Sequence, residues 1–300
     1  MTDLYDVVVI GAGLSGLSFL REWERIGADG SILALEYGDA VGGLLRHALP
    51  AEEFEEASQL LADAASGRAE IRCGTTAVGL LPAMNRDDPH VILTRGAGGT
   101  TRVSAKRVVL ASGGLETPRE HDQISGPRPA GVVTPIFVHQ ALANGLLPGR
   151  RAVVYGASKL AVVTALRMAT AGIETVLVPP PSSAVSSKDL APVTVESPSE
   201  LVAVQGYARL EQVVLRRDGT EHSLPADTLV YAVDLMPNTH WLHASGVATD
   251  DRGRVVVDDR YETSLAGVFA IGTVVAPSID HAHSVAMGAA AAHVLKGDIA

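Results

Sequence analysis

The residues with the clearest chemical potential lie near the amino terminus, in a run of regularly spaced glycines. The run reads Gly11-Ala12-Gly13-Leu14-Ser15-Gly16, a GxGxxG pattern, and it follows a strand-like apolar run at 5–10. The first glycine of such a pattern permits a tight turn, the second admits a pyrophosphate, and the third lets the following helix pack on the strand. Glu36 comes 20 residues after Gly16, where a carboxylate accepts hydrogen bonds from an adenosine ribose. We therefore predict a dinucleotide site at this turn.

The elements around this motif form a strand, a helix and a second strand. Residues 15–26 are expected to be helical because apolar side chains recur every third position, at Leu17, Leu20, Trp23 and Ile26. Gly27 follows directly, and glycine commonly ends a helix. A strand over 31–36 then completes a βαβ unit with parallel strands, which is the context in which a GxGxxG pattern binds a dinucleotide.

The same order of elements returns in the middle of the chain. Strands over 151–155 and 175–178 flank a helix over 159–171, and the turn reads Gly156-Ala157-Ser158-Lys159-Leu160-Ala161. Only the first glycine is in place, and Ser158 puts a Cβ where backbone would approach a pyrophosphate. Lys159 is interpreted as a solvated surface residue, with a phosphate contact as the alternative. The second strand ends in Val178-Pro179-Pro180-Pro181 rather than in a ribose ligand, so we predict a second Rossmann-like unit with a degraded nucleotide motif.

Shorter runs complete the predicted order. Strand-like runs at 71–72, 91–94 and 102–103 predict short antiparallel strands. The run at 108–112 predicts a further strand of the parallel sheet. A strand over 268–271 and an Ala-rich helix over 280–295 come last.

The expected fold is α/β, with two Rossmann-like dinucleotide-binding domains, the second inserted into the first. The first domain is predicted to comprise residues 1–117 and 247–300, and the inserted domain residues 118–246.

Composition excludes several classes of function. The chain has 24 Lys and Arg against 34 Asp and Glu, a net charge of -10, which disfavours nucleic acid and anionic membranes as partners. No apolar run reaches the length of a membrane span, and the acidic amino terminus does not read as a signal peptide, so we expect a cytoplasmic protein. Cys73 is the only cysteine, which excludes an internal disulfide, a CxxC pair and a Cys-ligated metal. We expect no metal site, and a buried, unreactive Cys73.

Several motifs together resemble a known family. They are the first glycine motif with Glu36, then Gly42-Gly43, Leu110-Ala111-Ser112-Gly113, and Thr263 to Gly272. Their order resembles the two-dinucleotide-domain flavoproteins, in the thioredoxin-reductase-like branch. The resemblance implies FAD in the first domain and NAD(P)H in the inserted one. It also implies that Gly43 passes close to the flavin, that Val78 lies by the adenine, that Gly272 approaches the ribityl chain and pyrophosphate, and that Leu44, Ser112, Gly113 and Ala282 contact the cofactor.

The chain departs from this family in three places. The first departure is that it lacks the redox CxxC pair. The second is that Ser158 alters the second nucleotide motif, and NAD(P)H binding is therefore expected to be weak or absent. Thr273 stands where the family places an aspartate on the ribityl hydroxyl. Threonine still offers a hydroxyl for a hydrogen bond, so FAD is expected to bind.

The run Asp280-His281-Ala282-His283 opens the last helix. In the family this helix start faces the flavin pyrimidine, and its positive dipole end stabilises the reduced anion. Asp280, His281 and His283 are the candidate catalytic residues, as proton donors or base. Surface or capping roles for the two histidines are the alternative.

A local stretch narrows the resemblance. Residues 111–119 and 124–132 resemble flavoprotein subunits of opine oxidases, hydrogen cyanide synthase and dye-linked proline dehydrogenases. These proteins oxidise amines or amino acids and often work in heteromers. The implied function is therefore that of an FAD-dependent oxidoreductase, not a disulfide reductase. It is expected to oxidise a small amine or amino-acid-like substrate or to relay electrons with a partner redox subunit. The family resemblance also implies a homodimer. Arg119 and Arg128 are interpreted as salt-bridge residues rather than a clamp for a substrate carboxylate.

Two other functions stay open. One is an NAD(P)H-dependent flavin reductase with an atypical second motif. The other is a non-catalytic nucleotide-binding subunit of a heteromeric flavoenzyme.

Overall fold

The computed structural model describes residues 3–44, 46, 59–63, 67–85, 88–186, 190–276 and 281–299. They form two compact units, the first made of Met1–Leu115 and Met236–Ala300, the second of Glu116–Leu235. The chain returns to the first unit at Met236 rather than at residue 247. The reason is that β16 (Met236–Pro237) pairs with β7 (Gly114–Leu115) and Leu242 packs in the core of the first unit.

The first unit is built on a seven-stranded sheet in the order β3-β2-β1-β6-β5-β4, with β17 also paired to β6. Its strands are β1 (Asp3–Ile10), β2 (Ile32–Leu35), β3 (Glu70–Arg72), β4 (Thr76–Leu81), β5 (His90–Gly96), β6 (Gly99–Leu110) and β17 (Val268–Ala270). β4 and β5 run antiparallel to their neighbours, whereas the other pairs are parallel. The end of β1 is apolar throughout because the parallel part of the sheet is buried on both faces.

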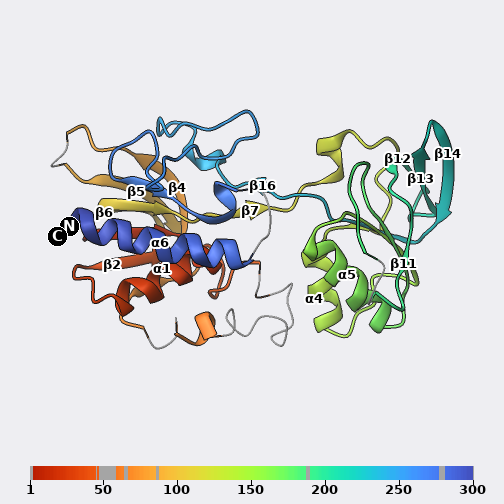
Figure 1. Ribbon diagram of the computed structural model, residues 1–300, viewed down its shortest axis with the longest axis horizontal. Helices are drawn as coiled ribbons and strands as arrows, with labels where there is room; N and C mark the ends of the chain where they lie inside the picture. Colours follow the sequence, from red (N-terminus) through yellow and green to blue (C-terminus); the bar gives the residue numbers. More distant parts are fainter. Residues whose placement is uncertain are drawn as a thin grey trace. The chain divides into compact units, whose positions relative to one another are not determined.

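Two helices cover one face of this sheet, α1 (Leu14–Arg25) and α6 (His281–Ile299). They run side by side in Figure 1. Gly288 permits their close approach, since a Cβ there would stand 2.3 Å from the Ser15 carbonyl oxygen. Phe19 and Trp23 of α1 stack with ring centroids 5.6 Å apart and fill the core beneath them.

The strand β6 corrects one feature of the predicted order. The sequence suggests separate strands at 102–103 and 108–112, but Gly99–Leu110 forms one strand. Its residues 99–105 pair with β5, and its residues 108–110 pair with β17. One long strand therefore serves both the antiparallel excursion and the parallel sheet, which local patterning does not reveal.

The second unit has a five-stranded parallel sheet in the order β11-β10-β9-β15-β8. Its strands are β8 (Val132–Val133), β9 (Arg151–Tyr155), β10 (Glu174–Val178), β11 (Thr194–Val195) and β15 (Thr228–Tyr231). α4 (Pro135–Ala143) and α5 (Lys159–Thr170) pack on one face. On the other face lies an antiparallel sheet of β12 (Glu200–Gln205), β13 (Gln212–Arg217) and β14 (Thr220–Pro225), which the sequence patterns did not predict.

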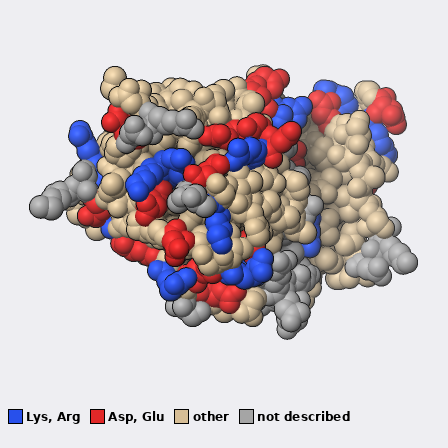
Figure 2. Space-filling view, turned by 60° about the vertical axis from the view of Figure 1, so that its left-hand side comes forward, with Lys and Arg blue, Asp and Glu red and all other residues tan. Residues whose placement is uncertain are grey.

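The architecture confirms the α/β fold with two parallel-sheet units, the second inserted into the first. Among the described residues, no helix is long and apolar enough to cross a membrane. On the face shown in Figure 2, acidic and basic side chains are interspersed rather than segregated by sign.

Candidate functional site

A cavity of about 300 Å³ lies in the first unit, where four parallel strands end. Ile10 ends β1, Leu35 ends β2, Ala111 follows β6 and Ile271 follows β17, and all four line it. The carboxyl edge of a parallel sheet is where α/β proteins bind their ligands. Predicted cofactor residues that line the cavity are Gly11, Gly13, Leu14, Ser15, Glu36, Gly42, Gly43, Leu44, Ser112, Gly113 and Thr273.

The three positions of the first motif are occupied by glycine for different structural reasons. Gly11 has a φ of +106°, and a Cβ on it would stand 2.2 Å from the Ala111 carbonyl oxygen. A Cβ on Gly16 would stand 2.0 Å from the Gly11 carbonyl oxygen, so this glycine lets α1 pack against the turn. By contrast, the nearest atom to a Cβ on Gly13 would be the Gly43 Cα, 3.9 Å away. Gly11 and Gly16 therefore build the turn, whereas Gly13 leaves space beside it.

The start of α1 is open toward this space. Gly13 is the N-cap residue, and no side chain caps the helix. The first amides of a helix have no partner within it, and they carry the positive end of the helix dipole. Leu14 and Ser15, which line the cavity, belong to this first turn. The arrangement suits a phosphate group.

The Glu36 carboxylate lies at the end of β2 and is only 3% exposed. Its Oε2 accepts a hydrogen bond from the Ala12 amide at 2.9 Å, and its Oε1 accepts one from the Gly38 amide at 2.8 Å. Each carboxylate oxygen accepts two bonds, so the group holds the glycine turn in place and keeps acceptor capacity for ribose hydroxyls.

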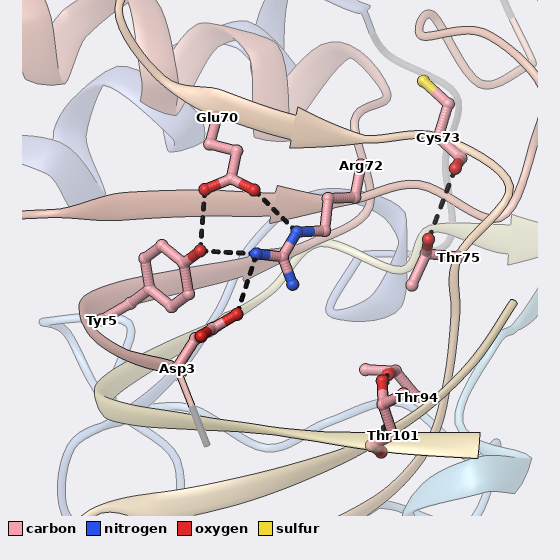
Figure 3. Close-up of polar contacts among 8 residues, drawn as sticks. All are labelled: Asp3, Tyr5, Glu70, Arg72, Cys73, Thr75, Thr94 and Thr101. Atoms are coloured by element: carbon pink, nitrogen blue, oxygen red, sulfur yellow. Dashed lines mark hydrogen bonds and ion pairs between the residues drawn. The ribbon is translucent and has the colours of Figure 1, made fainter. Parts of the chain in front are cut away.

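A polar cluster fixes the strand that leads to the cavity wall. Figure 3 shows Tyr5, Glu70 and Arg72 together on β1 and β3. The Tyr5 hydroxyl donates to Glu70 at 2.7 Å, and Arg72 donates to Glu70 at 2.7 Å. Burial and the Glu70 hydrogen bond raise the pKa of Tyr5 to about 12. The cluster joins β1 to β3, directly before the turn that brings Thr75 to the cavity.

One part of the cavity wall combines segments far apart in the chain. The Ser112 hydroxyl donates to the Asn238 carbonyl oxygen at 2.9 Å, across 126 positions of sequence. The Trp241 indole donates to the same oxygen at 3.2 Å. Asn238 and Trp241 line the cavity, as do Tyr37, Thr75, Thr76, Ala77, Ala111, Gly114, Leu115 and Ser284, and none of these was predicted. No local pattern marks Asn238 and Trp241, because tertiary packing alone brings them here, whereas Tyr37 directly follows the predicted Glu36 and Ala111 precedes the predicted Ser112.

Some predicted cofactor residues lie outside the cavity lining. Gly272 has a φ of +76°, and a Cβ there would stand 2.2 Å from the Ser15 hydroxyl oxygen, so packing on α1 explains this glycine. The Val78 side chain is 42% exposed, and Ala282 is exposed on α6. Ala12 and Gly16 support the turn from outside the lining.

The candidate catalytic residues stay predictions. Asp280 lies outside the described residues, and the His281 side chain is not described although its backbone begins α6. His283 is exposed on α6 and does not line the cavity.

Cys73 differs from its prediction. The residue is exposed rather than buried, because it lies in the turn after β3. Partial burial, Glu36 and Asp39 raise the pKa of its thiol, which lowers the thiolate fraction at neutral pH. We therefore still expect an unreactive thiol, because its pKa is raised and not because the side chain is buried in a core.

The second glycine motif is built differently from the first. A Cβ on Gly156 would stand 2.1 Å from the Ala232 carbonyl oxygen, so this glycine is required by the turn. Ser158 is the N-cap of α5, and its hydroxyl accepts the Ala161 amide at 3.2 Å. The Ser158 side chain therefore occupies a helix start that is open in the first unit.

The two arginines that the sequence analysis assigned to salt bridges, Arg119 and Arg128, both have structural partners. Arg128 is exposed, and its Nε lies 3.1 Å from the Glu120 carboxylate, which confirms the predicted salt bridge. Arg119 is buried, its Nε lies 3.5 Å from the Glu120 carboxylate, as predicted, and it also donates to the Gly126 and Pro127 carbonyl oxygens.

Two parallel-sheet units, each with a glycine turn that opens a helix, define the class of two-domain dinucleotide-binding proteins. The chain belongs to the pyridine nucleotide-disulphide oxidoreductase family, whose model matches residues 5–290. This family consists of flavoprotein oxidoreductases that typically bind FAD and use NAD(P)H.

Individual relatives agree with this assignment. A thioredoxin reductase from Treponema pallidum is 26% identical over 309 residues, covering 96% of this chain and 95% of that protein. The solved thioredoxin reductase from T. acidophilum has a TM-score of 0.80 at 24% identity and covers 99% of both chains. L-proline dehydrogenase from P. horikoshii has a TM-score of 0.72 at 18% identity, covering 99% of this chain and 56% of that one. The resemblance to the thioredoxin-reductase-like branch is confirmed, in a chain with one cysteine.

Proposed function

We propose that the cavity of the first unit binds FAD and that the protein is an FAD-dependent oxidoreductase. The observation that carries this proposal is the uncapped start of α1 beside Gly13 and the buried Glu36 carboxylate, both lining one cavity. A cofactor fits here because Gly13 and Gly43 have no side chains. A Cβ on Gly43 would stand 3.1 Å from the Gly13 Cα. The α1 amides would hold the pyrophosphate, Glu36 the ribose, and the Thr273 hydroxyl the ribityl chain.

Bound FAD supplies reversible transfer of two electrons, and the chain positions it. We propose that the substrate is a small amine or amino-acid-like molecule. Oxidation of its C–N bond to C=N would release a hydride, which the bound FAD would accept, and a proton, which would pass to solvent. A partner redox subunit would then take up the two electrons. The local resemblance of residues 111–119 and 124–132 and the fold shared with L-proline dehydrogenase support this class. Homodimer formation is part of the same proposal, and light scattering tests it.

The absorption spectrum of the purified protein tests the proposal first. A flavin spectrum, with FAD in the supernatant after denaturation, supports it. Anaerobic bleaching by a panel of amines and amino acids then identifies the substrate class. A colourless protein that takes up no added FAD would favour a non-catalytic nucleotide-binding subunit instead.

Loss of Cys73 is expected to leave the redox activity unchanged. The thiol has no second cysteine in the chain to pair with, and it lies in an exposed turn. We predict that Cys73→Ser keeps the flavin spectrum and the rate of substrate-driven bleaching within about twofold. Steady-state and anaerobic single-turnover rates check this. A loss of more than tenfold would show that the thiol takes part in the reaction.

Glycine at position 158 is expected to improve NAD(P)H binding. Ser158→Gly removes a Cβ from the turn and frees the Ala161 amide, at a cost of a few tenths of a kcal/mol in helix capping. We predict that the wild-type protein binds NADPH weakly and that the variant binds it at least about threefold more tightly. NADPH fluorescence titration measures both, with Ser197→Gly, an exposed position of the same unit, as the matched control.

Addition of NADPH to the wild-type protein also tests the alternative of an NAD(P)H-dependent flavin reductase. Saturable bleaching of the wild-type flavin by micromolar NADPH would favour that alternative. β10 ends at Val178 and three prolines follow directly, so these described residues supply no charged side chain for a ribose.

A further inference from the structure

Tyr37 is an exposed aromatic residue that the fold does not use for its core. Its side chain is 70% exposed, yet it lines the cavity of the first unit. It directly follows Glu36, the residue at the ribose position of the nucleotide motif. Large aromatic side chains usually bury their area in a folded protein, so an exposed ring on a cavity wall has area available for a ligand.

The backbone on both sides of Tyr37 is held firmly. The Glu36 amide donates to the Arg72 carbonyl oxygen at 3.0 Å, and the Thr75 amide donates to the Glu36 carbonyl oxygen at 2.9 Å. The Gly74 amide donates to the Gly38 carbonyl oxygen at 2.7 Å. Gly38 in turn donates to the Glu36 carboxylate at 2.8 Å. The ring therefore extends from a fixed segment, and holding it against a ligand costs little backbone entropy.

The neighbouring wall suits a flat base. Thr75, Thr76 and Ala77 line the same cavity, and the Thr75 amide is bonded to Glu36 itself. These side chains are small and uncharged. This end of the cavity thus combines an aromatic ring, a small-residue wall and a carboxylate for the sugar.

We propose that Tyr37 stacks on the adenine ring of the bound nucleotide and makes the adenosine half a main source of affinity. This inference rests on the proposed FAD site and assigns it a specificity residue. Aromatic stacking accepts the π-face of a base without reading its edges. The site should therefore prefer FAD over FMN, which lacks the adenosine.

The test compares nucleotide affinities of the full-length chain after its nucleotide is removed. FAD, ADP and FMN are titrated against wild type, Tyr37→Ala and Tyr37→Phe by calorimetry. We expect Tyr37→Ala to lower the affinities for FAD and for ADP by the same factor, about tenfold or more, and to leave the affinity for FMN unchanged. Tyr37→Phe should retain wild-type affinities because it keeps the ring. Tyr207→Ala, which removes a 93% exposed tyrosine of the second unit, is the matched control.

The outcomes separate this inference from the proposed function. Unchanged FAD and ADP affinities in Tyr37→Ala, in a wild type that binds FAD, would overturn the stacking role alone. An equal loss for FMN would also overturn it, because the damage would not be confined to the adenosine half. If the wild type binds ADP but not FAD, the redox proposal fails and the stacking role is still decided on ADP. Binding of neither nucleotide would overturn both.

Discussion

Alanine at Gly11 is expected to destabilise the first unit strongly, whereas alanine at Gly13 is expected to keep its stability and to weaken FAD binding. At Gly11 the backbone has a φ of +106° and the new Cβ would stand 2.2 Å from the Ala111 carbonyl oxygen. Strain and overlap together should lower the free energy of unfolding by more than about 3 kcal/mol. Urea denaturation followed by circular dichroism measures this loss.

The Gly13 variant isolates the binding role of the motif. Gly13 has a φ of -81° and a ψ of -168°, which alanine adopts without strain, and no neighbouring atom lies nearer than 3.9 Å to its Cβ. The added methyl group occupies space beside the start of α1, so FAD affinity should fall about tenfold or more, equivalent to ~1.4 kcal/mol. Flavin fluorescence titration measures the affinity.

A third glycine provides the control for both variants. A Cβ on Gly98 would contact nothing within 4 Å, so Gly98→Ala should change neither stability nor affinity. Wild-type FAD affinity in a folded Gly13→Ala protein would argue against a pyrophosphate at the α1 terminus. A fully stable Gly11→Ala protein would contradict the turn geometry.

Acidification is expected to destabilise the second unit through His139. This side chain is fully buried between α4 and α5. Its Nδ1 accepts a hydrogen bond from Arg167 at 2.5 Å, and its Nε2 donates to the Thr164 hydroxyl at 2.9 Å. Burial, and then the Arg167 charge, lower the pKa of His139 to about 4. A proton on Nδ1 would face the guanidinium directly.

The sign of the effect follows from the lowered pKa. The unfolded chain takes up the proton near pH 6.5, whereas the folded protein resists it until about pH 4. Stabilisation is therefore complete above pH 6.5 and is lost as the pH falls toward 4, by up to about 3 kcal/mol. Urea denaturation at intervals from pH 7.5 to 4 measures it.

His139→Gln is the control because it lacks the titrating group but keeps an amide for both partners. Its stability should fall much less over the same pH range. Buried His90 also has a lowered pKa but lies in the first unit, and Glu22, whose pKa is lowered to about 2, loses its contribution in a more acidic range. An unchanged pH dependence in His139→Gln would show that His139 does not control it.

Local sequence patterns determined the cofactor turn and the order of the main elements. Strand, glycine turn, helix and Glu36 all lie within the first 36 residues, and each role depends on backbone geometry that neighbouring residues dictate. The predicted strand at 151–155 coincides with β9, and the helix over 15–26 differs from α1 by one residue at each end. Family order extended the prediction to Gly42, Gly43, Ser112 and Thr273, which line the cavity.

Tertiary structure alone decided the remaining features. Asn238 and Trp241 reach the cavity because β16 pairs with β7, and strand pairing between distant segments leaves no local pattern. The exposure of Tyr37 and Cys73 likewise depends on what packs over them, not on their residue types. The difference between Gly13 and Ser158 was visible in the sequence, but only the folded α5 shows the serine hydroxyl bonded to the Ala161 amide. Periodicity and turn chemistry act over a few residues, whereas burial and site assembly depend on contacts between segments that the chain brings together only when it folds.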